Sequence, residues 1–201
     1  MVDSERRLRV GILAVQGDVR EHAAALRDVG ADPVEVRLPR DLAGIEALIL
    51  PGGESTAMRR LIEAYGLVEP ILGVAASGAP IWGTCAGMIL LARRITEGDK
   101  PILPLLDIEV RRNAYGRQLD SFEADLAVPA LGDEPVHAVF IRAPVVTDIG
   151  PGVEVLATDP LGRTVAVRQG RVLATAFHPE PTRDRRFHRA LVDQIPLETR
   201  A

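Results

Sequence analysis

The single cysteine of the chain, Cys85, lies in the sequence Gly83-Thr84-Cys85-Ala86-Gly87, between an apolar run and a segment with helical spacing. A Gly-x-nucleophile-x-Gly turn between a strand and a helix exposes a reactive side chain at a sharp corner. The following helix N-terminus offers free N–H groups and the positive end of a dipole, which favour a thiolate over a thiol. Because free cysteines are also among the most buried residues, this motif alone leaves a catalytic and a structural cysteine equally open.

A thiol nucleophile needs a base, and His178 is the best placed of the four histidines. It ends the alternating segment 172–177 and is followed by Pro179 and Glu180. Pro179 favours extended backbone, in which residues two apart point to the same side, so Glu180 can reach the His178 ring. We therefore expect a relay of Cys85, His178 and Glu180. The alternative is an ordinary His-Pro turn at a strand end with a solvated glutamate.

The other three histidines are not expected to take part in the chemistry. His22 lies within a predicted helix beside Glu21, which favours a solvated or capping role. His137 lies inside a strand pattern, and His188 is predicted on the polar side of the last helix.

The segment Gly52-Gly53-Glu54-Ser55 separates a predicted strand from a predicted helix. Its two glycines permit close approach to a ligand, and the Gly53 and Ala86 amides together could stabilise an oxyanion. A phosphate-binding loop is disfavoured, because Glu54 would repel phosphate and no lysine follows to complete a Walker pattern. Ser55 is expected to cap the helix in either case.

Two arginines near predicted strand ends, Arg112 and Arg142, suit the binding of a carboxylate by paired hydrogen bonds. Exposed arginines are common, so physical reasoning alone does not single these two out. No group of histidine, cysteine and carboxylate residues has metal-ligand spacing, and we therefore expect no metal site.

The composition restricts the class of protein. Of the 201 residues, 47% are hydrophobic and 26% are charged, which is typical of a soluble globular domain. A formal charge of −4 argues against broad nucleic-acid binding. The N-terminus lacks the apolar stretch of a signal peptide, no run is long enough to span a membrane, and one cysteine cannot form an internal disulfide. We therefore expect a cytoplasmic protein with no membrane partner.

Apolar strands alternate with helical segments in the first half of the chain. Strands are predicted at 8–15, 34–38, 47–50 and 80–83, and helices at 19–29, 56–65, 68–76 and 86–94. This alternation predicts an α/β fold with an open, mostly parallel sheet and helices on both faces. Short strand-like segments at 122–128, 136–142, 153–158, 164–168 and 172–177 predict extra antiparallel strands in the C-terminal half, before a last helix at 183–194. We expect a single domain over 1–201, with 1–7 as a flexible N-terminal extension.

The chemical groups share a position relative to these elements. Gln16, the Gly52-Gly53 turn, Cys85 and His178 each follow a predicted strand. In open sheets of this kind, chemistry collects at the carboxyl ends of the strands. The sequence therefore predicts one site formed by segments that are distant along the chain.

Three segments together resemble the signatures of class I glutamine amidotransferases: Pro51-Gly52-Gly53-Glu54-Ser55-Thr56, Gly83-Thr84-Cys85-Ala86-Gly87-Met88 and Phe177-His178-Pro179-Glu180. The segments at 13–17, 20–22, 112–118, 120–123 and 139–144 narrow the resemblance to the glutaminase subunit of the pyridoxal 5'-phosphate synthase complex. The similarity extends from about residue 9 to residue 188.

The resemblance implies a flavodoxin-like fold and hydrolysis of L-glutamine to glutamate and ammonia, with Cys85 as nucleophile and His178 and Glu180 as its relay. It implies glutamine contacts from Gly52, Gly53, Glu54, Arg112, Ile141 and Arg142. It also implies that the ammonia passes to a separate synthase subunit that builds vitamin B6, and that this chain needs no cofactor of its own.

Two residues depart from the family pattern. Trp82 precedes the cysteine motif where a smaller aromatic residue is expected, and this change should be tolerated. Pro181 follows Glu180 where leucine is expected, and its effect on the final helix and on the position of Glu180 is left open.

Two other functions stay open on the sequence. The first is a glutaminase subunit for another pathway, such as histidine or aminobenzoate biosynthesis. The second is a non-catalytic binding subunit in which the cysteine turn is structural.

Overall fold

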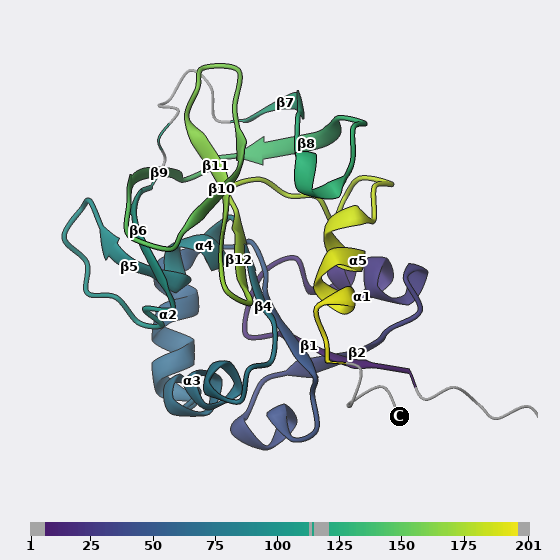
Figure 1. The fold of residues 1–201 in the computed structure, drawn as a ribbon. Coiled ribbons are helices and arrows are strands. Elements are labelled where there is room, and N and C mark those ends of the chain that lie inside the picture. Colours follow the sequence, from purple (N-terminus) through teal and green to yellow (C-terminus); the bar gives the residue numbers. More distant parts are fainter. Residues whose placement is uncertain (1–6, 113, 115–120, 197–201) are drawn as a thin grey trace, which may run out of the picture.

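The computed structural model describes residues 7–112, 114 and 121–196 (Figure 1). The expected N-terminal extension lies outside the described residues, except for Arg7. Asn113 and residues 115–118 and 120, which contribute to the family resemblance, also lie outside them.

Five α-helices are found in the described residues: α1 (Val19–Asp28), α2 (Ser55–Ala64), α3 (Val68–Ala76), α4 (Ala86–Leu91) and α5 (Arg186–Asp193). The strands are β1 (Arg9–Leu13), β2 (Asp32–Val36), β3 (Ala47–Leu50), β4 (Ile81–Thr84), β5 (Ala92–Ile95), β6 (Leu106–Arg111), β7 (Ser121–Leu126), β8 (Val136–Ile141), β9 (Val145–Ile149), β10 (Glu154–Thr158), β11 (Thr164–Gln169) and β12 (Val172–Thr175). Two short 3-10 turns, Pro39–Leu42 and Pro129–Leu131, complete the description.

The main sheet has the strand order β2-β1-β3-β4-β12-β11-β9-β6-β5, with β10 paired to β11. The neighbouring strands from β2 to β12 all run parallel. The pairs β12–β11, β11–β9 and β9–β6 are antiparallel, β5 pairs in parallel with β6 at the far edge, and β7 and β8 form a separate hairpin. The predicted fold class, a mostly parallel sheet with added antiparallel strands, is confirmed.

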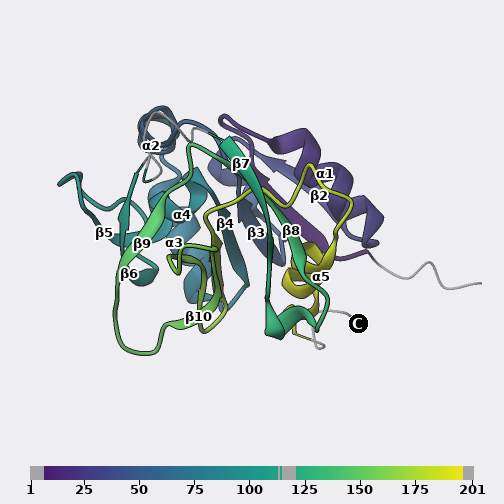
Figure 2. The ribbon, with the colours of Figure 1, turned by 90° about the horizontal axis from the view of Figure 1, so that it is seen from above.

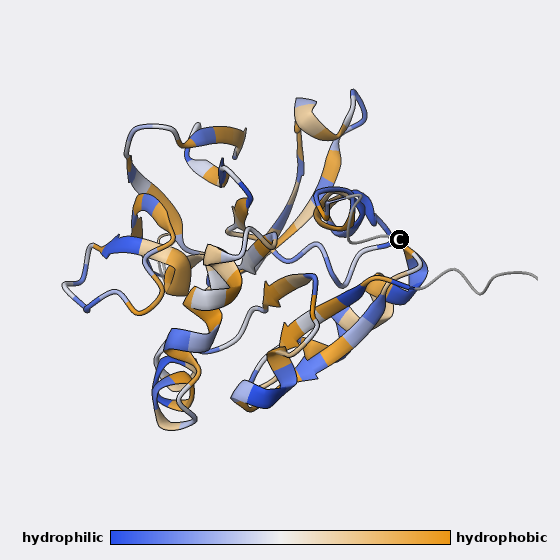
Figure 3. Cartoon of the chain, turned by 60° about the horizontal axis from the view of Figure 1, so that its bottom comes forward, coloured by the Kyte–Doolittle hydropathy of each residue, from blue (hydrophilic) through white to orange (hydrophobic). Residues whose placement is uncertain are grey.

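Helices cover the parallel part of the sheet on both faces (Figures 1 and 2). The α1 and α5 helices pack together on one face, and α2, α3 and α4 lie on the other. The strands β3 and β4 are buried along their whole length, which explains their continuous apolar sequence. Most helices carry hydrophobic and hydrophilic residues side by side along their length (Figure 3), because only one face of each meets the core. The α4 helix differs, because all of its residues are buried.

The parallel strands bring four loops to one edge of the sheet. The carboxyl ends of β1, β3, β4 and β12 lie next to one another, because these strands are neighbours in register. The loops that follow them carry Gln16, the Gly52-Gly53 turn, Cys85 and His178. The predicted assembly of these segments at one edge is confirmed.

The predicted helix at 86–94 is wrong in its last part. The α4 helix ends at Leu91, and β5 begins at once and pairs in parallel with β6. Arg94 on β5 forms ion pairs with Asp107 and Asp148 from the neighbouring strands. The sequence prediction also missed β6 and β9, whose pairing partners are distant in sequence.

No helix within the described part of the chain is long and apolar enough to cross a membrane.

Candidate active site

Cys85 occupies a strained backbone corner between β4 and α4. Its φ of 48° and ψ of −104° lie outside the regions that residues with a Cβ normally adopt. The backbone N–H of Cys85 donates to the Thr175 carbonyl at 2.7 Å, which ties the corner to β12. The side chain is only slightly exposed, and its Sγ lies 3.8 Å from the carbonyl oxygen of Ile141. This geometry is that of a nucleophile turn.

The two glycines that flank Cys85 are required by close packing. A Cβ on Gly83 would lie 2.5 Å from the carbonyl carbon of Gly87, and a Cβ on Gly87 would lie 2.0 Å from the Leu50 carbonyl oxygen. The α4 helix therefore starts directly against β3 and β4. Ala86 is the first residue of α4, so its amide N–H has no carbonyl partner within the helix.

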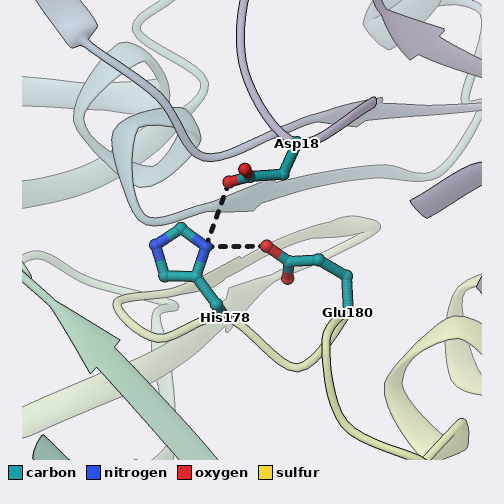
Figure 4. A group of neighbouring side chains, drawn as sticks. All are labelled: Asp18, His178 and Glu180. Carbon is teal, nitrogen blue, oxygen red and sulfur yellow. Dashed lines mark hydrogen bonds and ion pairs between the residues drawn. The ribbon is translucent and has the colours of Figure 1, made fainter. Parts of the chain in front are cut away.

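His178 is fixed by its backbone and by Glu180. Its N–H donates to the Val139 carbonyl of β8 at 2.8 Å, which places the residue between the main sheet and the β7–β8 hairpin. Its Nδ1 lies 2.6 Å from Oε1 of Glu180 (Figure 4). Its side chain lines the same cavity as Cys85, and the Cys85 thiol is one of the groups that raise the pKa of His178. The structure thus brings together the three residues of the predicted relay.

Pro181 does not loosen this contact. The short distance between His178 and Glu180 is maintained, and α5 begins only at Arg186, after a turn. The departure at Pro181 therefore leaves the contact between His178 and Glu180 intact. Trp82 is fully buried, and its Nε1–H donates to the Thr175 hydroxyl at 3.2 Å, so the larger ring has a polar partner.

A second carboxylate, from Asp18, faces the same ring nitrogen of His178. The Asp18 Oδ2 lies 3.3 Å from Nδ1, the nitrogen that Glu180 also faces, while the other ring nitrogen points away from both carboxylates (Figure 4). Sequence reasoning missed Asp18, although it lies in the loop after the first strand, two residues beyond Gln16. The sequence did offer one indication of its role, because Asp18 follows a predicted strand whose carboxyl end lies at the site.

The two carboxylates favour a protonated His178. Burial acts to lower the pKa of this imidazole, but hydrogen bonds with Asp18, Cys85 and Glu180 and the charge of Glu180 outweigh it and raise the pKa to about 12. Burial also raises the pKa of the Glu180 carboxyl, and the hydrogen bond from His178 opposes that shift.

Replacing Asp18 with asparagine should narrow the pH range of activity from its alkaline side. Asp18 raises the pKa of His178, so removal of its charge lowers that pKa and the imidazolium is lost at a lower pH. Because the Asp18 side chain is 42% exposed, the alkaline limb of kcat/KM should move down by only about 0.5–1 pH unit. Asp32→Asn, at the amino end of β2, is the matched control and should leave the profile unchanged. An unshifted limb in Asp18→Asn would contradict this role.

A cavity of about 570 Å³ opens in front of Cys85 and His178. Its lining includes most residues predicted to contact the substrate or the oxyanion: Gly53, Glu54, Ala86, Arg112, Ile141 and Arg142. Gly52 is not part of this lining and lies directly behind the histidine, where an added Cβ would be 2.2 Å from His178 Cε1. The cavity is large enough to hold a small amino acid beside the thiol.

The glycine loop is held by Gln16. Oε1 of Gln16 accepts a hydrogen bond from the Glu54 amide at 2.8 Å, and a Cβ on Gly53 would lie only 2.5 Å from this oxygen. The Glu54 carboxylate accepts from the amides of Thr56 and Ala57, so Glu54 caps α2. The predicted capping by Ser55 is therefore wrong.

The two predicted carboxylate-binding arginines differ in their surroundings. Arg112 is anchored by Asp99, 2.6 Å away, and by Glu97, 3.8 Å away. Arg142 has a φ of 43° at the end of β8, a conformation that turns the chain towards the cavity it lines. A positive φ in a residue with a side chain is typical of functional sites.

The sequence did not reveal a group of potential metal ligands. Asp18, His178 and Glu180 each present a ligand atom, and these atoms lie within 4.8 Å of one another. Both carboxylates face the same nitrogen of His178, an arrangement that a protonated N–H explains by hydrogen bonding alone.

The environments predicted for two other histidines are wrong. His22 and His188 are fully buried rather than solvated, and they contact each other behind the relay, 3.0 Å apart. Sequence periodicity could not indicate this, because their burial results from the packing of α1 against α5. His137 lies on β8, half exposed between Asp125 and Glu123.

Comparisons with known proteins agree with this geometry. A pyridoxal 5'-phosphate synthase subunit PdxT of Frankia alni is 58% identical to this chain over 189 residues, which cover 93% of the chain and 94% of that protein. The PdxT of Acidothermus cellulolyticus is 54% identical, with both proteins covered completely.

Solved structures show the same relationship. A crystal structure of a glutamine amidotransferase superposes with a TM-score of 0.87 at 48% identity, covering 92% of this chain and 98% of that one. The PurLQS structure from Thermotoga maritima has a TM-score of 0.73 at 18% identity, covering 95% and 100%, and so shares the fold alone. The model of the SNO glutamine amidotransferase family matches residues 12–197, and the chain belongs to this family.

Proposed function

We propose that this chain is the glutaminase subunit of a pyridoxal 5'-phosphate synthase, which hydrolyses L-glutamine and delivers the ammonia to a synthase subunit. The observation that carries the proposal is that Cys85 and His178 line one cavity bordered by a glycine loop, with His178 held by Glu180 at 2.6 Å. The names of the relatives support the choice of pathway. The whole chain would act as one glutaminase domain.

In the first proposed step, the Cys85 thiolate attacks the side-chain amide carbon of glutamine. A carbon–sulfur bond forms, and the carbonyl oxygen becomes an oxyanion that the amides of Gly53 and Ala86 would stabilise. His178 then donates a proton to the amide nitrogen as the carbon–nitrogen bond breaks, and ammonia leaves. The product is a glutamyl thioester on Cys85.

In the second step, water hydrolyses the thioester. His178, now neutral, accepts a proton from the attacking water, and the carbon–sulfur bond breaks to release glutamate. The Cys85 thiolate and the imidazolium are thereby restored. Glu180 holds the ring orientation through Nδ1 and stabilises its positive charge in both steps.

Substrate selection would use the groups around the cavity. Arg112 and Arg142 would bind the α-carboxylate of glutamine, with Ile141 packing against the aliphatic part. Gly53 and Glu54 would border the amide end, and Gly52 would leave room for the His178 ring behind them. These steps require no cofactor, nucleic acid or membrane. We place the reaction in the cytoplasm, because the free cysteine needs no oxidising compartment.

The proposal is tested by ammonia release from glutamine, measured with and without the candidate synthase. We expect low activity alone and a rise of about tenfold or more when the synthase binds, because docking would set the glycine loop and exclude water. Equal rates with and without the partner would contradict the coupling.

Co-purification distinguishes the remaining alternatives. Retention of a synthase from histidine or aminobenzoate biosynthesis would assign the chain to another pathway. A non-catalytic binding subunit would leave Cys85 unlabelled by a reactive glutamine analogue, whereas a nucleophilic Cys85 should be labelled.

A further inference from the structure

We propose that His22 is a positioning residue that holds the relay carboxylate by donating its Nε2–H towards Glu180, and that His188 fixes His22 in the required tautomer. The inference deepens the proposed glutaminase function and rests on it. It is carried by a chain of buried polar contacts behind the active site, on the side away from the cavity.

Glu180 presents two oxygens with different surroundings. Oε1 is bonded to His178, whereas Oε2 is buried and has no hydrogen-bond partner among the residues that the structure describes. His22 Nε2 lies 3.6 Å from Oε2. A buried carboxylate oxygen without a donor is costly, so the orientation of the His22 ring matters for Glu180.

His22 is held on both sides. Its Nδ1 lies 3.0 Å from His188 Nε2, and its Nε2 lies 3.2 Å from the hydroxyl oxygen of Thr84, the residue before Cys85. Both histidines are fully buried and pack edge-on against Trp82. His22 thus connects α1 and α5 with the end of β4 that carries the nucleophile.

Both rings are neutral in this environment. Burial, together with the nearby His188 and His178, lowers the pKa of His22 well below its usual value. Burial and Arg185 lower the pKa of His188 to about 3. Two neutral rings joined by one hydrogen bond share a single proton between them, so only two arrangements exist.

In the first arrangement, His22 donates from Nδ1 to His188. The lone pair of His22 Nε2 would then face the Glu180 carboxylate, and His188 would carry a proton on Nδ1. That Nδ1 is buried and has no partner in the described part of the chain. This arrangement therefore leaves the buried N–H of His188 without an acceptor, and it sets the His22 lone pair against the negative charge of Glu180.

In the second arrangement, His188 donates from Nε2 to His22 Nδ1. His22 then carries its proton on Nε2, where the N–H points to Thr84 Oγ1 and towards Glu180 Oε2. The unpartnered Nδ1 of His188 is only a lone pair, which costs less than an unpaired N–H. The second arrangement leaves fewer buried hydrogen-bonding groups without a partner, and in it the His22 N–H points towards the Glu180 carboxylate.

The consequence for catalysis is a pH effect. The titratable groups that face Glu180 are His178 on its own segment and Asp18 and His22 from the start of α1, and His188 of α5 lies behind His22. Without the His22 donor, Glu180 would take up a proton more readily and support the His178 imidazolium less. The acid limb of kcat/KM should therefore move to higher pH.

Three substitutions separate this role from simple packing. Glutamine at position 22 keeps an N–H donor near the Nε2 position, asparagine keeps a polar group only near Nδ1, and phenylalanine keeps the ring volume alone. We expect the acid limb to rise by about one pH unit and kcat to fall about tenfold in His22→Phe and His22→Asn, with little change in KM. His22→Gln should stay within about threefold of the wild-type kcat. His137→Gln, on the exposed face of β8, is the control that should change nothing.

A measurement on the unmodified protein tests the tautomer without any activity. Long-range ¹H–¹⁵N spectra distinguish the two nitrogens of each of the four histidines, and the variants assign them. We expect a proton on Nε2 of His22 and a bare Nδ1 at neutral pH. A proton on Nδ1 of His22, or an acid limb in His22→Phe that coincides with the wild type, would overturn the proposal. Absence of glutaminase activity in the wild type would instead count against the proposed function. The protonation of the His22 nitrogens would then test the contact between His22 and Glu180 on its own.

Discussion

Replacing Cys85 with alanine should reduce glutamine-dependent ammonia release by at least about 10⁴-fold, because the variant lacks the sulfur that forms the thioester. The residual rate would come from the oxyanion donors and substrate binding alone. The measurement is ammonia release in the presence of the synthase, at saturating glutamine. Alanine retains the Cβ and its backbone preference, so the melting temperature should stay within a few degrees of the wild type.

Two further substitutions at this position serve as controls. Cys85→Ser keeps a hydroxyl at the corner but is a weaker nucleophile, and it should also be nearly inactive while remaining folded. Cys85→Gly removes the Cβ that makes a φ of 48° unfavourable, and it should be as inactive as the alanine variant but about 1 kcal/mol more stable. Ammonia release by Cys85→Ala at a rate near that of the wild type would refute the assignment of the nucleophile.

The alanine and glycine variants together test whether strain at the corner serves function. If Cys85→Gly is more stable than Cys85→Ala and both are inactive, the wild-type chain retains an unfavourable backbone conformation in order to present the sulfur. Equal stability of the two variants would mean that the surrounding contacts, such as the bond from the Cys85 amide to Thr175, already remove the cost.

Local patterns in the sequence were sufficient for the elements that build the parallel sheet. The strand at 47–50 and the helix at 68–76 match β3 and α3 because continuous burial and helical periodicity are properties of neighbouring residues. The same reasoning placed Glu180 two residues after His178 on one side of an extended segment, and the structure brings the two within 2.6 Å. Spacing along the chain thus predicts contacts within one segment.

Contacts between distant segments were beyond that reasoning. Asp18 reaches His178 only because β1 and β12 end at the same edge of the sheet, and His22 meets His188 only because α1 packs on α5. The end of α4 at Leu91 depends on the pairing of β5 with β6, which overrides the helical pattern. In each case the deciding partner is distant in sequence.

Gly52→Ala should lower kcat by about 10²–10³-fold, the second largest effect that we expect. An added Cβ would lie 2.2 Å from His178 Cε1 and 2.8 Å from Asp18 Oδ2, so the imidazole must move. Displacement by about 1 Å breaks the alignment of His178 between Glu180 and the thiol, and such misplacement is enough for a loss of this size. The measurement is kcat for ammonia release in the synthase complex, together with the melting temperature.

Gly73→Ala is the matched control for this substitution. Gly73 lies in α3, and an added Cβ there would meet no atom within 4 Å, so the variant should keep full activity and gain about 0.5–1 kcal/mol of stability. Gly52 is therefore expected to act through the position of one ring rather than through backbone freedom. A Gly52→Ala variant that is folded and as active as Gly73→Ala would show that His178 need not stand where the structure places it, and the relay geometry would have to be revised.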